Sequence, residues 1–236
     1  MQSPTADPLL LLSTDALDPH VRYDYWREMV FCYFDAVPDA PDAVQRFESH
    51  VVSLISERGE INSYRSSDVT GQRTRRQYQR DGGDEVALIY VLKGKAVYQP
   101  ENGVPTEAAA GKFFCYDSAR PARVQWSAGE QLHFSLPRAA VMEAIGGDVP
   151  EPDVLARSLN ESRLAPYLLS QIRRLTREAP QLSPFERATM LDGTLELAKA
   201  VLRGSLHPAR AFADGETALY YSACTHIDAH LGKPDL

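Results

Sequence analysis

Histidine side chains are the groups of this chain best suited to hold a metal ion or move a proton near neutral pH. His226 and His230 are four residues apart, which puts them on one side of a helix. The residues between them lack the glutamate of a zinc-protease motif, and no third ligand is near in sequence. In the β-rich region only His50 and His133 are available, and a site of two histidines and a carboxylate would require both to converge. The sequence therefore predicts no metal, no cofactor and no catalytic residues, and makes His133 a polar residue on a strand.

Small-molecule binding is the chemistry that residues 86–136 favour. A pocket needs a few hydrogen-bonding groups among apolar and aromatic walls. Strand alternation puts Gln131, His133 and Ser135 on one face and the intervening apolar residues on the other, without deciding which face is inside. For any one aromatic residue, ordinary packing is the simpler interpretation. The predicted ligand-binding residues are Arg65, Tyr90, Trp126, Gln131 and His133.

Short strands must position these residues. Runs of β-favouring residues cover 87–92, 95–99, 112–117, 122–126 and 131–136. Asn102-Gly103 accepts the positive φ of a tight hairpin, and Pro121 limits the strand after it. An earlier strand pair is expected at 47–55 and 61–65, with Gly59 at the turn. This spacing predicts a small antiparallel barrel or sandwich.

The region before and beside these strands gives mixed signals. Residues 1–12 are expected to form a mobile arm. Asp18-Pro19 supplies a cap and a first-turn proline, so a helix is predicted from there to about residue 34. Its expected buried face is Trp26, Met29, Val30 and Tyr33. Residues 66–84 carry four arginines and are interpreted as a solvated loop or hairpin, with a ligand or partner site as the alternative.

Helices are predicted after residue 138. A short helix over 139–145 ends at Gly146-Gly147, and Asn160 is a candidate cap for the next helix. Ser183 and Glu186 form a capping box with Pro184 in the first turn. A last helix is expected over 214–231.

A narrow apolar stripe on the helix after Ser183 predicts a dimer interface. Its residues are Leu191, Leu195, Ala198 and Leu202. The alternative is that a second stripe in the same chain covers it. That stripe consists of Leu164, Leu168, Ile172 and Leu175.

Composition narrows the class of protein. The net charge is −7 and the sequence pI about 5.4, so the chain is a poor candidate for gripping a phosphate backbone by itself. Three cysteines without paired spacing fit a reducing compartment. No signal peptide, membrane span, phosphate-binding glycine loop or nucleophile elbow is found. A cytoplasmic protein without a membrane partner is expected.

Several motifs, in this order, resemble the AraC-type transcriptional regulators whose N-terminal domain is a cupin-like, AraC-binding-like barrel. The opening motifs are Ser13-Thr14-Asp15-Ala16-Leu17, Arg22 and Tyr25-Trp26-Arg27-Glu28. The barrel motifs are Tyr90-Val91-Leu92-Lys93-Gly94-Lys95, residues 111–121 and residues 131–138. Lys112 departs from the usual Asp of the second barrel motif. Residues 227–236 resemble the opening of the helix-turn-helix domain.

The resemblance implies an α+β fold: an antiparallel cupin-like (jelly-roll) barrel preceded by a helix and followed by a helical dimerisation segment. It divides the chain into an arm, helix and effector-binding barrel (1–138), a helical linker and dimerisation region (139–212) and the first helix of a truncated helix-turn-helix domain (213–236). The metal-binding histidine pattern of enzymatic cupins is missing, with Ala122-Arg123 near the position of the second-motif histidine.

The implied function is ligand sensing and dimerisation for a transcriptional regulator. A small organic effector would bind in the barrel, the partner would be a second copy, and DNA would be contacted only through helix-turn-helix units absent from this chain. The alternatives are a metal-dependent cupin enzyme and a ligand-free dimerising barrel.

Overall fold

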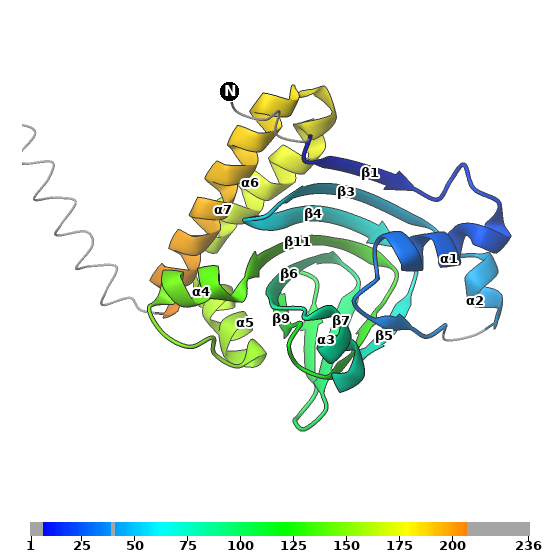
Figure 1. Ribbon diagram of the computed structural model, residues 1–236, viewed down its shortest axis with the longest axis horizontal. Coiled ribbons are helices and arrows are strands. Elements are labelled where there is room, and N and C mark those ends of the chain that lie inside the picture. The colour runs from blue at the N-terminus through cyan, green and yellow to red at the C-terminus, as the bar shows by residue number, and fades with distance from the viewer. Residues whose placement is uncertain (1–6, 39–40, 207–236) are drawn as a thin grey trace, which may run out of the picture.

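The computed structural model describes residues 7–38 and 41–206. Two antiparallel sheets pack face to face, with helices at both ends of the curved larger sheet (Figure 1). The six-stranded sheet has the order β1 (Leu9–Ser13), β3 (Ser49–Ser56), β4 (Gly59–Ser66), β11 (Gly129–Pro137), β6 (Glu85–Lys93) and β9 (Phe113–Asp117). The five-stranded sheet has the order β2 (Asp35–Ala36), β5 (Val69–Arg73), β10 (Ala122–Trp126), β7 (Lys95–Pro100) and β8 (Thr106–Ala109).

The two faces of β11 decide where the polar residues go. Leu132, Phe134 and Leu136 join a core shared with the C-terminal helices. Gln131 and His133 therefore point between the two sheets, toward the barrel interior. Of the two orientations that the sequence allowed, the structure has the one with a polar interior.

The N-terminal region contains more regular structure than the sequence indicated. Residues 9–13 form β1, which pairs with β3, so the prediction of a mobile arm is wrong for residues 9–12. Helix α1 (Pro19–Met29) begins as predicted, with Asp18 Oδ1 accepting from the His20 amide at 2.9 Å. It ends five residues early, and Met29 and Tyr33 are exposed, whereas Trp26 is buried. A short helix α2 (Pro41–Gln45) follows.

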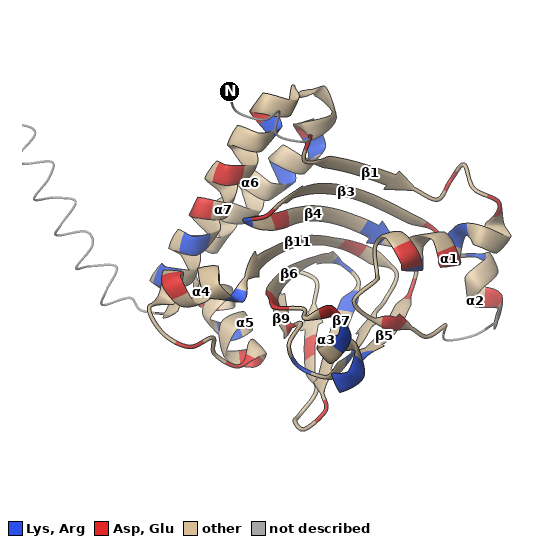
Figure 2. Cartoon of the chain, in the orientation of Figure 1, with Lys and Arg blue, Asp and Glu red and all other residues tan. Residues whose placement is uncertain are grey.

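The arginine-rich stretch 66–84 is folded. It forms β5 and helix α3 (Arg75–Asp81), and Thr74 and Gln77 make a capping box at the start of α3. Arg73 is buried and pairs with Asp81 at 2.7 Å. The basic residues of α3 are visible in Figure 2.

Four helices cover the outer face of the six-stranded sheet (Figure 1). They are α4 (Arg138–Ile145), α5 (Pro152–Glu161), α6 (Ala165–Glu178) and α7 (Pro184–Leu206), with a 3₁₀ turn, η1 (Ala179–Gln181), before α7. Gly146 ends α4 with φ 66°, and the Ser183–Glu186 capping box forms, both as predicted. Asn160 lies inside α5 and its side chain hydrogen-bonds the backbone of Phe113, so it is no cap. The predicted helix over 214–231 lies outside the described residues.

The apolar stripe on α7 lies inside the chain. Its residues are all within 1% exposure and pack in the core shared by the sheet and helices α4–α7. On α6, Leu168, Ile172 and Leu175 are buried in the same core, whereas Leu164 and Tyr167 are exposed. The second stripe therefore contributes to covering the first, which is the intrachain alternative.

Candidate functional site

A cavity of about 40 Å³ lies between the barrel wall and the segment that follows α1. Its wall residues come from strands β4, β6, β9, β10 and β11: Tyr64, Ser66, Ile89, Tyr116, Trp126, Gln131 and His133. Its cover comes from α1 and the connection to β2: Trp26, Val30, Phe31, Tyr33 and Phe34. No lining side chain is an acid, a lysine or an arginine.

The cover is an aromatic stack. The Phe31 ring lies nearly parallel to Trp26 (centroids 4.9 Å apart, planes at 19°) and to Phe34 (5.0 Å, 18°). Its edge meets the wall residue Trp126 at 5.4 Å. Gly71 of β5 makes room for this ring, because a Cβ there would lie 2.3 Å from Phe31 Cε1. Phe31 therefore belongs to the connection between α1 and β2, and its ring packs against residues of strands β5 and β10.

His133 is held neutral and in one tautomer. Burial lowers the pKa of His133 to about 4, so the ring is uncharged at neutral pH. Asn62 Nδ2 lies 2.9 Å from His133 Nδ1 and also donates to Glu60. Because an amide nitrogen only donates, Nδ1 accepts and the proton of the neutral ring sits on Nε2. His133 therefore presents an N–H donor.

Three buried polar atoms near the cavity have no hydrogen-bond partner within residues 7–38 and 41–206. They are His133 Nε2, Trp126 Nε1 and Asn62 Oδ1. A buried polar group without a partner is costly, and most such groups in folded proteins are satisfied. His133 and Trp126 both line the cavity, so a molecule there can satisfy two N–H donors.

Two partly buried carboxylates, those of Glu60 and Glu85, lie beyond Asn62, which donates a hydrogen bond to Glu60. Burial raises the pKa of Glu60 and, through the same cause, that of Glu85. Neither forms an ion pair with a described residue. Burial, with a smaller contribution from these carboxylates, raises the pKa of Tyr33 to about 12. Burial also raises the pKa values of Tyr64 and Tyr116 well above the usual value for tyrosine. The cavity and its surroundings thus favour uncharged groups.

The structure brings three of the five predicted ligand-binding residues together. Trp126, Gln131 and His133 line the cavity. Tyr90 packs on the helix-covered side of β6, against Phe113 at 5.0 Å, and Arg65 is exposed on β4. Both have the opposite orientation to the inward one expected, because each is one residue out of phase with an inward neighbour, Ile89 or Tyr64. A ligand-binding role for any of the five stays a prediction.

The cover was missing from the predicted site. Phe31 and Phe34 were expected inside a helix that in fact ends at Met29. Residues Tyr64 and Tyr116 belong to strands that were predicted, but their inward phase is fixed only by pairing with β3 and β6. Aromatic density around residues 23–34 was the available signal.

Two classes of site are not found in the part of the chain that is described. No three side chains of the His, Cys, Asp or Glu type gather as a candidate metal site. No helix there has the length and apolar character needed to cross a membrane.

Comparison with known proteins gives the family. The AraC-binding-like domain matches residues 25–203, and the chain therefore belongs to the AraC-binding-like domain family. No curated protein matches it.

The solved structure of an AraC-like regulator supports the fold. The AraC-like transcriptional activator CuxR is similar at 14% identity, with a TM-score of 0.64 over 97% of this chain and 80% of that chain. An RmlC-like cupin protein from Desulfovibrio desulfuricans is 17% identical, with a TM-score of 0.30 over 43% of this chain and 94% of that chain. The predicted α+β class with a cupin-like barrel and C-terminal helices is confirmed.

Proposed function

We propose that this chain is the ligand-sensing and dimerisation portion of an AraC-type transcriptional regulator. The observation that carries the proposal is the barrel cavity, where His133 and Trp126 present buried N–H groups without protein partners. In a protein of this family, such a cavity suits a small organic effector. The barrel then has a sensing role rather than a catalytic one, and action on DNA would place the protein in the cytoplasm.

A route from the cavity to the helices supports the relay part of the proposal. Tyr116 lines the cavity, and the next residue on β9 is the buried Asp117. The Asp117 carboxylate accepts from Arg138, the first residue of α4, and from Arg120 at 3.0 Å. Arg120 also pairs with Glu151, which precedes α5. A ligand that shifts β9 acts on both helices through these contacts, and the helices would pass the change to helix-turn-helix units.

The effector test is a ligand screen followed by thermal unfolding of the full chain. Ligands of the cavity should raise the melting temperature of the wild type. They should lose most of that effect in Trp126→Phe and His133→Leu, and keep it in Tyr90→Phe, which alters the other face of the same sheet. Stabilising ligands that act equally on all four proteins bind elsewhere and contradict the proposal.

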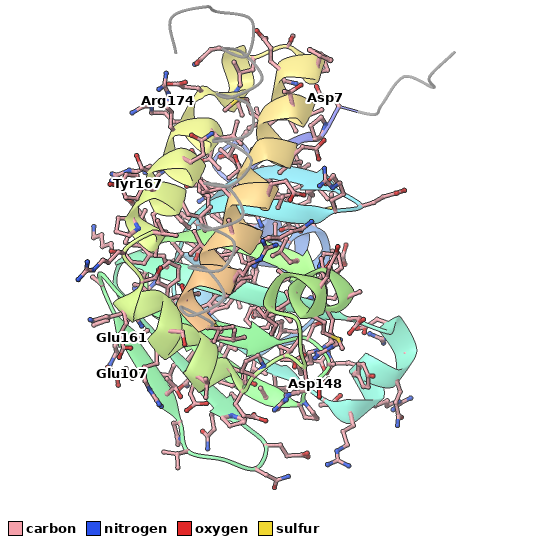
Figure 3. The ribbon with its side chains drawn as sticks, turned by 90° about the vertical axis from the view of Figure 1, so that its left-hand side faces the viewer. Asp7, Glu107, Asp148, Glu161, Tyr167 and Arg174 are labelled. Atoms are coloured by element: carbon pink, nitrogen blue, oxygen red, sulfur yellow. The ribbon has the colours of Figure 1, made fainter. Side chains whose placement is uncertain are left out.

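Self-association is the second part of the proposal, because a regulator that reads paired half-sites needs two linked chains. The stripe of Leu191, Leu195, Ala198 and Leu202 is occupied within the chain. Tyr167 lies on the outer side of α6 and is exposed (Figure 3), and Leu164, the residue before α6, is also exposed. We therefore place the contact with a second copy on this side of α6.

A further inference from the structure

We infer that the effector is an uncharged aromatic molecule with a hydrogen-bond acceptor, and that its ring replaces Phe31 in the aromatic stack. This inference rests on the proposed function, since it names the ligand of the same cavity. It adds the chemical class of the ligand and the side chain that must leave.

The size of the cavity requires a side chain to leave. Its volume is about 40 Å³, whereas apolar cavities that take up a benzene ring in other proteins measure about 150 Å³. The wall side chains stand on hydrogen-bonded strands. The cover residues Val30 to Phe34 lie between α1 and β2. The backbone–backbone hydrogen bonds there are those of a cap and a turn, Val30 N to Trp26 O at 2.8 Å and Phe34 N to Phe31 O at 3.1 Å, and Arg73 Nη1 donates to the Tyr33 carbonyl at 2.6 Å.

Phe31 already occupies the position that a ligand ring would take. Two parallel rings flank it, Trp126 presents its edge, and the Gly71 backbone forms the floor. A position bounded in this way accepts a flat ring, because stacked and edge-on contacts are favourable only for planar partners. The segment that carries Phe31 would move with it. The ligand would then bind the state in which Phe31 has left the stack and not the state in which Phe31 fills it, and this difference in affinity shifts the equilibrium between the two states.

Hydrogen bonding decides the polar part of the ligand. Trp126 Nε1 and His133 Nε2 both lie at the cavity as N–H donors without a described partner. The matching ligand group is an acceptor such as a carbonyl oxygen.

Charge decides against ions. No cation lines the cavity, and Arg73 uses its guanidinium on Asp81 and on the carbonyls of Tyr33 and Ser118. A carboxylate ligand would have no counter-ion among the lining residues. A cationic ligand would find no anionic group among the lining residues.

The probe for the test is tryptophan emission. The chain has two tryptophans, and both Trp26 and Trp126 line the cavity, so the signal reports on this site alone. The ligands are benzamide, its anionic analogue benzoate, benzylammonium, the non-planar cyclohexanecarboxamide, and toluene, which has no acceptor. The wild type should bind benzamide saturably, at about millimolar concentration or below. The other four ligands should bind at least about tenfold more weakly, as expected when one good contact is lost.

Variants test the exchange with Phe31. Phe31→Ala removes the competing side chain and should tighten benzamide binding about tenfold or more, because the open state no longer has to be populated. Phe31→Leu keeps apolar volume in case the alanine variant fails to fold, and should tighten binding by a smaller factor. Tyr25→Ala is the matched control: it truncates an exposed aromatic residue on α1 that does not line the cavity, and it should leave binding unchanged.

The outcomes separate this inference from the proposed function. Tight, saturable binding of an aliphatic or charged ligand, lost in Trp126→Phe, would overturn the aromatic class and leave the sensing function standing. Benzamide binding that Phe31→Leu and Phe31→Ala both weaken would overturn the exchange with Phe31. If no compound of a chemically mixed library alters tryptophan emission, both the inference and the proposed effector site are wrong.

Discussion

The buried histidine gives the barrel interior a pH dependence that can be measured. His133 has a folded pKa of about 4, and its unfolded value is about 6.5. The unfolded state therefore binds more protons below pH 6.5, and folding stability falls as the pH drops from 6.5 toward 4. At pH 5 this amounts to about 2 kcal/mol relative to neutral pH.

The measurement is urea unfolding of wild type and His133→Gln at pH 7.5 and pH 5. The raised pKa values of Glu60 and Glu85 act in the opposite direction, since their protonated forms are favoured in the folded state and that contribution is lost as the pH rises. Both glutamates are present in both proteins, so the difference between the two proteins isolates His133. Equal losses of stability in wild type and variant would contradict the assignment of a neutral, buried His133.

Gly71 is the position where one methyl group should disturb the cover of the cavity. A Cβ there would lie 2.3 Å from the Phe31 ring and 3.2 Å from Phe34 Cβ. Gly71→Ala should therefore cost about 1–3 kcal/mol, as overpacking does, and should shift tryptophan emission as Phe31 leaves its stack with Trp26. Gly147→Ala, where a Cβ meets nothing within 4 Å, should change neither quantity. Denaturant unfolding and emission spectra check both expectations.

Residue chemistry was predictable from the sequence where local rules apply. The inward placement of Gln131 and His133 follows from alternation once one face of β11 is known to be covered by helices. The phase of Tyr90 and Arg65 was not predictable, because a shift of one residue exchanges the two faces of a strand and only strand pairing fixes it. The role of Phe31 depends on a contact with Gly71, forty positions away in sequence, which no local pattern contains.

At the scale of elements, the connection between β9 and the helices is expected to be a main support of the fold. Asp117 is 2% exposed and accepts hydrogen bonds from Arg120, Arg138 and the Ala119 amide. Asp117→Asn removes the charge between two arginines and should destabilise the chain by about 3 kcal/mol. Asp148→Asn, at an exposed position (Figure 3), should stay within about 0.5 kcal/mol. Urea unfolding of the two variants and the wild type at pH 7.5 tests this, and similar losses in both variants would contradict it.

The same variant tests the relay. If Asp117 links the cavity to α4 and α5, ligand binding in Asp117→Asn should protect the barrel amides from hydrogen exchange while protecting those of α4 and α5 less than in wild type. If Asp117 has a purely structural role, the protection that the ligand gives should fall in Asp117→Asn by the same proportion in the barrel, in α4 and in α5. The exchange experiment with and without a ligand that binds the wild type separates the two cases.

Elements with strong end signals were predictable, and those without were not. The Asp18 cap and the Ser183–Glu186 capping box locate the starts of α1 and α7. Strand β5 and helix α3 were missed because polar and arginine-rich residues dominate them. Their contacts lie with residues that no local pattern includes: β5 pairs with β10, and the buried Arg73 pairs with Asp81. Strand β8 (Thr106–Ala109) has a sequence of small and polar residues, and only its pairing with β7 makes it a strand.

At the scale of the whole molecule, α6 and α7 pack on the outer face of the larger sheet, and the sides of these helices that face away from the sheet are on the surface (Figures 1 and 3). Charged residues of both signs are spread over these helices (Figure 2). The stripe of leucines on α7 satisfied the sequence criterion for an interface as well as for a core. Local periodicity cannot separate these two, since both bury one side of a helix.

Two charge substitutions distinguish a core position from an interface position. Leu195 is 0% exposed and packs among sheet and helices, so Leu195→Glu should unfold the chain or destabilise it by more than about 4 kcal/mol. Tyr167 is 70% exposed, so Tyr167→Glu should leave the unfolding free energy of a single chain within about 0.5 kcal/mol.

Self-association is where the Tyr167 substitution should act. If two copies meet on the outer side of α6, the wild type should sediment as a dimer at high concentration, and Tyr167→Glu should shift the equilibrium toward monomer by about tenfold or more, because a charge would replace an aromatic contact between chains. Tyr25→Glu, an exposed aromatic position on α1 at the other end of the molecule, is the control and should sediment like the wild type (Figure 1). Sedimentation equilibrium over a hundredfold concentration range gives the constants. A wild type that is monomeric throughout contradicts dimerisation itself, whereas a dimer that Tyr167→Glu does not weaken rules out this side of α6 as the contact.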